Sequence, residues 1–175
     1  MMAIKRVKTM KRKTLNIARN ISVFMGLAML LGLGSCDNNM IYDENIAVGD
    51  NVWTFDDIKT FEFDVSDTIS PVNIFVNLRT TTEYQYSNIY VFLYSEYPNG
   101  ATNKDTLEFL LAKPDGEWYG DNTGTIVEFK GLIATGGRFS TAGKYRFQIQ
   151  HAMREKELPE VIDVGMRVEI MEDVD

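Results

Sequence analysis

Cys36 is the only cysteine and His151 the only histidine in a chain of 175 residues, so nucleophilic and metal chemistry have few possible sites. The thiol follows Gly34 and Ser35, two small residues that leave the backbone before it open to a peptidase. With Cys36 used as an attachment point, the remaining chain has no disulfide, no cysteine zinc site and no cysteine nucleophile. A Ser-His-Asp arrangement would have to use His151, which comes just past a predicted strand. A solvated or structurally hydrogen-bonded imidazole is the favoured interpretation.

The segment before Cys36 has the order of a bacterial export signal. Residues 1–35 contain seven Lys and Arg and no Asp or Glu, and the apolar residues 21–33 follow this basic start. This apolar stretch is shorter than the roughly 18–20 residues that span a bilayer as a stable helix. The sequence Leu33-Gly34-Ser35-Cys36 resembles the lipobox of bacterial lipoproteins, which predicts cleavage between Ser35 and Cys36 and lipidation of Cys36. An ordinary secretory peptide with a chance cysteine is the alternative.

The sign of the charge changes at this boundary. Residues 36–175 contain 11 basic and 25 acidic residues and therefore carry a net charge of −14, within a whole-chain net charge of −7. Such an acidic chain repels phosphate, so no nucleic-acid partner is expected. Residues 36–51 are polar and acidic with few apolar side chains, which predicts a flexible tether. The predicted organisation is a signal peptide over residues 1–35, a tether over 36–51 and one domain over 52–175.

Period-two patterns of apolar residues dominate the predicted domain. Seven runs have strand length and strand periodicity, and Gly and Pro turn signals separate them. These runs cover residues 61–65, 72–78, 89–94, 107–111, 126–129, 145–150 and 164–170. Their spacing predicts an all-β fold, an antiparallel β-sandwich of the immunoglobulin-like or jelly-roll-like kind with about seven to nine strands. Only residues 153–158 look helical, and Pro159 would end that helix.

Aromatic side chains offer a candidate binding surface. Tyr84, Tyr86, Trp118 and Tyr119 form the predicted interaction surface, because exposed aromatic side chains stack on sugars and anchor protein contacts. Alternating aromatic residues in a strand more often pack in a core, and this alternative stays open. The wider aromatic run comprises Tyr84, Tyr86, Tyr90, Phe92, Tyr94 and Tyr97.

Acidic residues offer two weaker possibilities. The loop of residues 115–122 has oxygen ligands that could bind calcium, but it lacks the spacing of an EF-hand, and an ordinary Gly/Asp turn is favoured. Carboxylate pairs such as Glu62 with Asp64, or Asp115 with Glu117, could serve a hydrolase, but such pairs occur by chance in an acidic chain. We therefore expect no enzyme activity, no cofactor, no metal and no small-molecule substrate.

An ordered series of short motifs gives a more specific indication. The series begins with Cys36-Asp37 and Tyr42-Asp43-Glu44-Asn45 and runs through Trp53, Asp67-Thr68-Ile69-Ser70, Asn77-Leu78-Arg79, Glu83-Tyr84-Gln85-Tyr86-Ser87-Asn88, Pro98-Asn99-Gly100, Asp105-Thr106, Leu111-Ala112-Lys113-Pro114-Asp115-Gly116-Glu117-Trp118, Ala142-Gly143-Lys144-Tyr145, Gln150-His151-Ala152-Met153-Arg154, Leu158-Pro159 and Asp163-Val164-Gly165-Met166-Arg167-Val168-Glu169. With these motifs the chain resembles the GldH family of Bacteroidetes gliding-motility lipoproteins over nearly all of residues 36–170.

The resemblance implies a non-enzymatic, lipid-anchored lipoprotein of the cell envelope, a component or accessory of gliding-motility machinery. Its expected partners are the membrane, through the lipid anchor, and envelope proteins of a larger complex. The family supplies no catalytic residue, and Cys36 is the one defined site that transfers. We expect the outer membrane and a periplasm-facing orientation, because Asp37-Asn38-Asn39 carries a single charge where surface display favours an acidic run. A glycan-binding surface lipoprotein of a nutrient-uptake system is the alternative.

Overall fold

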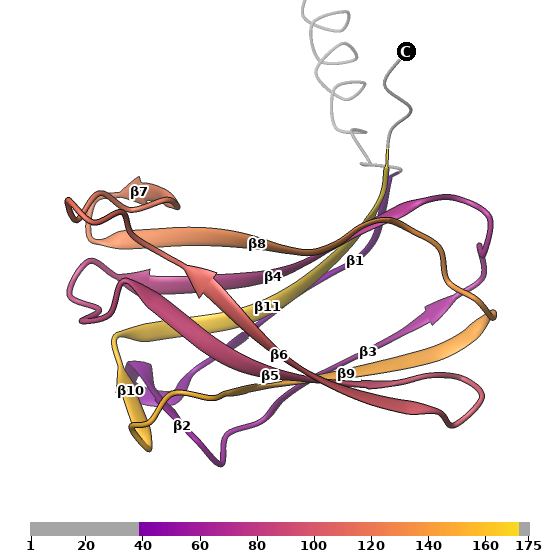
Figure 1. Cartoon of the computed structure of the whole chain (residues 1–175), viewed down its shortest axis with the longest axis horizontal. Coiled ribbons are helices and arrows are strands. Elements are labelled where there is room, and N and C mark those ends of the chain that lie inside the picture. The colour runs from indigo at the N-terminus through magenta and orange to yellow at the C-terminus, as the bar shows by residue number, and fades with distance from the viewer. Residues whose placement is uncertain (1–38, 172–175) are drawn as a thin grey trace, which may run out of the picture. The chain divides into compact units, whose positions relative to one another are not determined.

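Antiparallel strands make up most of residues 39–171, the part of the chain that this computed structural model describes (Figure 1). The predicted signal peptide and its boundary at Ser35 and Cys36 lie outside the described residues. The strands are β1 (Met40–Ala47), β2 (Val52–Thr54), β3 (Lys59–Val65), β4 (Val72–Thr81), β5 (Asn88–Glu96), β6 (Thr102–Leu110), β7 (Asp121–Thr123), β8 (Ile126–Gly137), β9 (Gly143–His151), β10 (Glu157–Pro159) and β11 (Val161–Ile170). A short 3-10 turn, η1 (Gly49–Asn51), precedes β2.

These strands form two packed sheets and a small third one. The first sheet has the order β1-β11-β4-β8-β7 and the second the order β3-β9-β5-β6, while β2 pairs with β10 at one end of the sandwich (Figure 1). All pairings are antiparallel. The predicted all-β antiparallel sandwich is therefore confirmed, but the described residues contain 11 strands rather than the predicted seven to nine. No helix in this part of the chain has the length and apolar character needed to cross a bilayer.

The core follows from the alternation seen in the sequence. On β9 the side chains of Tyr145, Phe147 and Ile149 are buried, whereas those of the alternating residues Lys144 and Arg146 are exposed. The same pattern on the facing sheet buries Val164, Met166 and Val168 of β11 completely. Removal of this apolar surface from water supplies about 25 cal/mol per Å² toward folding.

One side of the sandwich is closed by a contact between its two sheets. The ring of Tyr42 on β1 stacks on the ring of Phe63 on β3, with centroids 4.7 Å apart. Phe63 in turn stacks on Phe147 of β9 at 5.8 Å. The aromatic rings thus tie the edge strand of the first sheet to the edge strand of the second.

The tether predicted for residues 36–51 is wrong from Met40 onward. Residues Met40 to Ala47 pair with β11, with Met40 opposite Glu169 and Ala47 opposite Asp163. The sequence of this strand shows no regular alternation of apolar residues, because the strand lies at a sheet edge. There its polar side chains can face water, and only a few apolar ones need to pack. Residues 36–38 lie outside the described part of the chain.

The helix predicted for residues 153–158 is also wrong. Residues Glu157 to Pro159 form β10 instead, and Leu158 lies opposite Trp53 of β2. Both of these side chains are 0% exposed. Burial of this pair outweighs the helical propensity of the neighbouring charged residues, which is a weak local preference.

Candidate functional site: an aromatic hollow

Two loops at the surface of the sandwich enclose a hollow of about 690 Å³. One loop connects β4 to β5, and the other connects β6 to β7. All four residues of the predicted interaction surface line it. The lining of this aromatic hollow comprises Tyr84, Gln85, Tyr86, Ser87, Leu110, Ala112, Lys113, Pro114, Gly116, Trp118 and Tyr119.

A small hairpin positions Trp118 and Tyr119. Ala112 bridges to Trp118, and the backbone N–H of Lys113 donates to the carbonyl of Glu117 at 2.8 Å. The turn between them follows the sequence Lys113-Pro114-Asp115-Gly116, in which the N–H of Gly116 donates to the carbonyl of Lys113. Proline and glycine suit these positions because proline presets its φ and Gly116 has a φ of +90°, which other residues rarely adopt.

The second loop supplies the floor of the aromatic hollow. Tyr84 is only 4% exposed and packs edge-on against Tyr86, with ring centroids 5.6 Å apart. Backbone hydrogen bonds from Leu111 and Ala112 to the carbonyl of Ser87 join this loop to the hairpin. Tyr84 is therefore a supporting residue rather than an exposed contact.

The hydroxyl of Tyr84 is buried without a hydrogen-bond partner among the described residues. Burial raises its pKa far above the usual value because the phenolate would be poorly solvated there. The hydroxyl stays protonated over the physiological range and offers one unused donor at the base of the aromatic hollow.

The upper surface of the hollow exposes two large apolar side chains, Leu110 at 58% and Tyr119 at 54%. Trp118 and Tyr86 are half-buried beside them. Lys113 lies on the rim, where its ammonium contacts the Glu117 carboxylate at 2.5 Å, and this hydrogen bond raises the pKa of Lys113. Aromatic side chains half-buried beside exposed aliphatic ones are typical of the anchor residues of protein interfaces. The geometry therefore favours binding over covalent chemistry.

Leu110 was missing from the predicted surface. The sequence placed Leu107, Phe109 and Leu111 on the apolar side of a strand, which left Leu110 unexplained. In the structure Phe109 is buried and Leu110 faces outward. The signal available in the sequence was a leucine at a position whose neighbours on the same face are charged or polar.

The wider aromatic run of the sequence does not form one surface. Phe92 and Tyr94 pack together on the solvent side of β5, with centroids 6.3 Å apart, and the ammonium of Lys104 lies 3.9 Å from the ring centre of Phe92. Tyr90 shares their face and is 37% exposed, whereas Tyr97 lines a separate cavity between the sheets. β5 pairs with both β6 and β9 and is therefore a central strand of its sheet.

His151 is a core residue of the sandwich. It is 0% exposed, and its ring packs against Trp53 at 5.3 Å and Phe55 at 5.8 Å. Among residues 39–171, neither ring nitrogen has a partner at hydrogen-bond distance and angle, so the structure shows neither the solvated nor the bonded imidazole that was expected. Burial lowers the pKa of His151, and the nearby backbone of Lys156 only partly opposes this effect.

Three of the acidic residues singled out by the sequence, Glu62, Asp115 and Glu117, have structural partners. Asp115 accepts a hydrogen bond from the N–H of Glu117, which is a turn contact. Glu62 pairs with Arg146 at 3.2 Å and with Lys144 at 3.8 Å across β3 and β9. Within residues 39–171, no three His, Cys, Asp or Glu side chains gather closely enough to hold a metal ion.

Together, the fold and the aromatic hollow define a β-sandwich domain that presents aromatic and aliphatic anchors on its surface. Residues 40–168 match the family model of the GldH lipoproteins, and the chain belongs to this family. As a member it is a membrane-anchored lipoprotein of the cell envelope.

Two curated relatives are similar along most of their length. A gliding motility lipoprotein GldH homolog of Christiangramia forsetii is 34% identical over 155 residues, which cover 85% of this chain and 94% of the relative. The gliding motility lipoprotein GldH of Flavobacterium johnsoniae is 36% identical over 117 residues, which cover 63% of this chain and 72% of the relative. Among solved structures, a carbohydrate-binding module specific for non-crystalline cellulose has a TM-score of 0.37 and 8% identity, covering 73% of this chain and 70% of that one. A likeness at this level carries no argument about function.

Proposed function

We propose that this chain is a non-enzymatic component of gliding-motility or related envelope machinery, anchored by a lipid on Cys36 and docked to a protein partner through the aromatic hollow. The names of its relatives support a role in gliding motility. Cleavage after Ser35 would leave Cys36 as the first residue of the mature chain, with two or more acyl chains providing stable attachment. We further propose that this membrane is the outer membrane and that the domain faces the periplasm.

The observation that carries the docking role is the exposure of Leu110 and Tyr119 over half-buried Trp118 and Tyr86. Exposed aliphatic and aromatic side chains in one patch are costly to leave in water, and a partner that covers them gains the corresponding transfer free energy. Tyrosine and tryptophan lose little conformational entropy on binding and are enriched among interface residues that dominate affinity. A scaffold subunit needs such a patch and no catalytic group.

Chemical cross-linking in cells followed by mild-detergent purification of the tagged protein tests this function. The wild type should recover a reproducible set of envelope proteins, and the Cys36→Ala variant should lose both membrane attachment and these partners. A matched Ser70→Ala variant, on the exposed connection between β3 and β4, should behave as the wild type. Recovery of an intact, membrane-attached protein without partners would contradict the scaffold role.

A second candidate function is glycan binding, because the aromatic hollow also has the ring surfaces on which sugars stack. Affinity electrophoresis of the purified protein in gels that contain cellulose, xylan, glucan or mannan derivatives tests it. Retardation that is lost in the Tyr119→Ala variant would favour a glycan-binding lipoprotein of a nutrient-uptake system. Unchanged mobility in all of these gels would count against it.

A further inference from the structure

The side of the sandwich opposite the Tyr42–Phe63 contact is open. β6 is the last strand of its sheet, and among the described residues nothing pairs with its second edge. β8 is paired by β7 only from Ile126 to Glu128, so its outer edge is free of strand partners from Phe129 to Gly137 in this part of the chain. Two free strand edges therefore flank the same side of the molecule (Figure 1).

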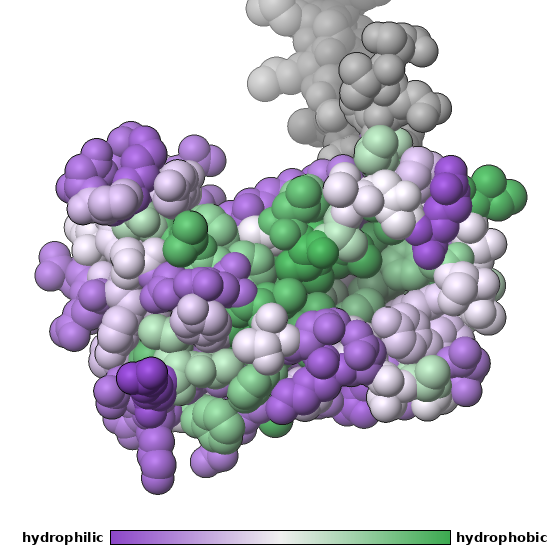
Figure 2. All heavy atoms as spheres, in the orientation of Figure 1, coloured by the Kyte–Doolittle hydropathy of each residue, from purple (hydrophilic) through white to green (hydrophobic). Residues whose placement is uncertain are grey.

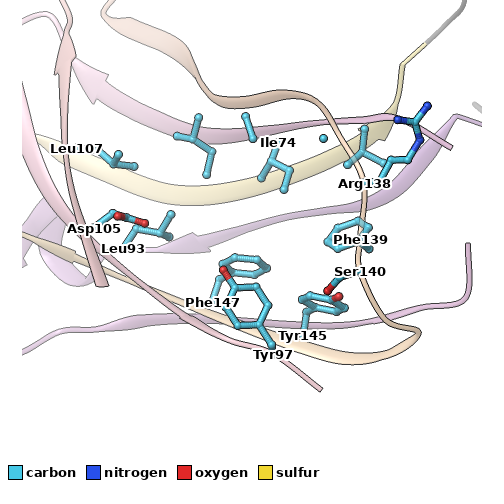
Figure 3. A pocket seen from close by; sticks show the side chains of 14 residues that line it. Ile74, Leu93, Tyr97, Asp105, Leu107, Arg138, Phe139, Ser140, Tyr145 and Phe147 are labelled. Carbon is cyan, nitrogen blue, oxygen red and sulfur yellow. The ribbon is translucent and has the colours of Figure 1, made fainter. Parts of the chain in front are cut away.

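A cleft of about 290 Å³ lies between these edges. Its upper wall comes from β4 and β8, including Ile74, Ile133 and Ala134, and its lower wall comes from β5, β6 and β9, including Leu93 and Phe147. Figure 3 shows aliphatic side chains on one wall facing aromatic rings on the other. In the space-filling view the cleft is visible as a hollowed apolar band between two polar rims (Figure 2).

The cleft is closed at one end and open along its length. At the closed end the ring of Phe109 lies so close to Gly131 of β8 that an added Cβ there would be 2.5 Å from the ring. Phe109 also packs against Phe129, with ring centroids 5.8 Å apart. Away from this contact β6 diverges from β8, which leaves Ile74, Ile133 and Leu107 only half-buried (Figure 1).

One carboxylate faces into this apolar space. Asp105 of β6 lies directly opposite Leu93 of β5, a buried residue of the lower wall, so both side chains project from the same face of the sheet. Figure 3 shows the Asp105 carboxylate beside Leu93 and Leu107. Its hydrogen-bond partner is the Nδ2 atom of Asn103 at 2.7 Å, and no lysine or arginine among the described residues pairs with it.

We propose that this cleft receives an extended peptide segment of a partner protein, which adds a strand at the free edges of β6 and β8. Its side chains alternate between apolar and polar, and a lysine or arginine at one inward position pairs with Asp105. The free N–H and C=O groups of the edges supply backbone hydrogen bonds, and the apolar walls accept the alternate side chains. None of the residues that line the cleft belongs to the aromatic hollow, so this site is distinct from the one proposed above.

A peptide fits these observations better than an acyl chain does. A lipid tail would gain nothing from two unpaired strand edges. It would also bring hydrocarbon against the exposed Asp105 carboxylate, and desolvation of this charge without a partner is costly. A strand with a basic residue satisfies both the edges and the charge. Until a partner binds, the inward-facing Asp105 also protects the edge strand from pairing with other chains.

The test uses the full-length mature protein in lipid nanodiscs and a fluorescent nine-residue peptide, Val-Thr-Val-Thr-Lys-Thr-Val-Thr-Val, as the probe. Fluorescence anisotropy should show saturable binding, and hydrogen exchange should slow at amides of β6 and of β8 after Phe129. A permuted peptide of the same composition, without alternation, should bind at least about tenfold more weakly. Ala134→Phe, which fills the cleft, should weaken binding by a similar factor, whereas Leu132→Ser on the outer face of β8 should not.

A second set of measurements tests whether Asp105 pairs with the basic residue of the peptide. Asp105→Lys should weaken the lysine peptide about tenfold and should favour a peptide in which glutamate replaces that lysine. Absence of saturable binding, equal binding by Ala134→Phe, or binding without slowed exchange at β6 and β8 would overturn the proposal. Hydrogen exchange at β6 and β8 that is slowed by dodecanoate but not by the peptide would also overturn the proposal, because the cleft would then be an acyl-chain site. None of these results depends on which partner occupies the aromatic hollow.

Discussion

Arg79 on β4 and Asp163 on β11 form a charge-assisted contact between neighbouring strands, in which Arg79 Nε donates to Asp163 Oδ2 at 2.6 Å. The Asp163 side chain is 3% exposed, whereas that of Arg79 is 42% exposed. The hydrogen bond to Asp163 raises the pKa of Arg79. Asp163 is buried in a five-stranded sheet, and the guanidinium of Arg79, whose side chain extends from the surface, compensates its negative charge.

Removal of this cation should therefore be costly. Arg79→Ala leaves Asp163 buried without its partner, and we expect the free energy of unfolding to fall by about 2–4 kcal/mol in urea titrations. Arg146→Ala is the matched control, since Arg146 and its partner Glu62 are both about half-exposed, and such pairs contribute less than about 1 kcal/mol. Equal losses in the two variants would contradict the role given to Asp163.

The burial of His151 predicts a pH dependence of stability. Its pKa is lowered in the folded state, so the unfolded chain binds the proton more readily below its ordinary pKa of about 6.5. The contribution of His151 to stability is therefore complete above that pH and is lost as the pH falls toward the folded-state pKa, with a slope of at most about 1.4 kcal/mol per pH unit.

Urea titrations at pH 7.5 and pH 5.5 measure this effect. His151→Leu removes the titrating group while keeping an apolar side chain beside Trp53, so its loss of stability on acidification should be smaller than that of the wild type. Carboxylates elsewhere titrate equally in both proteins and cancel in the comparison. An identical pH response of the two proteins would show that His151 is not buried in its neutral form.

Much of the sandwich could be predicted from the sequence because its long strands obey a two-residue period. The alternation of Tyr145, Phe147 and Ile149 identified β9, and that of Val164, Met166 and Val168 identified β11. The short strands were missed because three residues contain less than two periods. β2 and β10 are defined by the pairing of Trp53 with Leu158, which is a tertiary contact that no local pattern reveals.

β1 could not be predicted for a different reason. Its sequence is polar because it forms a sheet edge, and its contribution comes from Tyr42, which stacks on Phe63 of the other sheet. The aromatic hollow was partly predictable, since Trp118 and Tyr119 were identified by type. That they meet Tyr86 and Leu110 depends on two loops far apart in the sequence.

The contact between Tyr42 of β1 and Phe63 should contribute measurably to the free energy of unfolding. Tyr42→Ala should lower the free energy of unfolding by about 1–3 kcal/mol, because it removes a stacked aromatic pair and half-buried apolar area. Asp56→Ala, in the exposed turn after β2, serves as the comparison at a position without such a contact. A Tyr42→Ala protein as stable as the wild type would mean that residues 40–47 behave as a tether.

Gly131 should tolerate no side chain. A Cβ at this position would lie 2.5 Å from the ring of Phe109. Gly131→Ala should therefore lower the free energy of unfolding by about 1–3 kcal/mol, the usual cost of overpacking. Gly137→Ala in the same strand is the control, since its Cβ would meet nothing within 4 Å. Thermal unfolding should distinguish the two variants, and similar melting temperatures would refute the close approach of β6 to β8.

The proposed docking role of the aromatic hollow is tested most directly by the double variant Leu110→Ser/Tyr119→Ala, analysed by in-cell cross-linking and quantitative mass spectrometry of the recovered partners. The control is Leu132→Ser/Tyr90→Ala, which removes one leucine at 52% exposure and one tyrosine at 37% exposure elsewhere on the surface. We predict that the hollow variant stays folded and membrane-attached but loses about tenfold or more of the recovered envelope partners, whereas the control keeps them. Full recovery of the partners by the hollow variant would contradict the account.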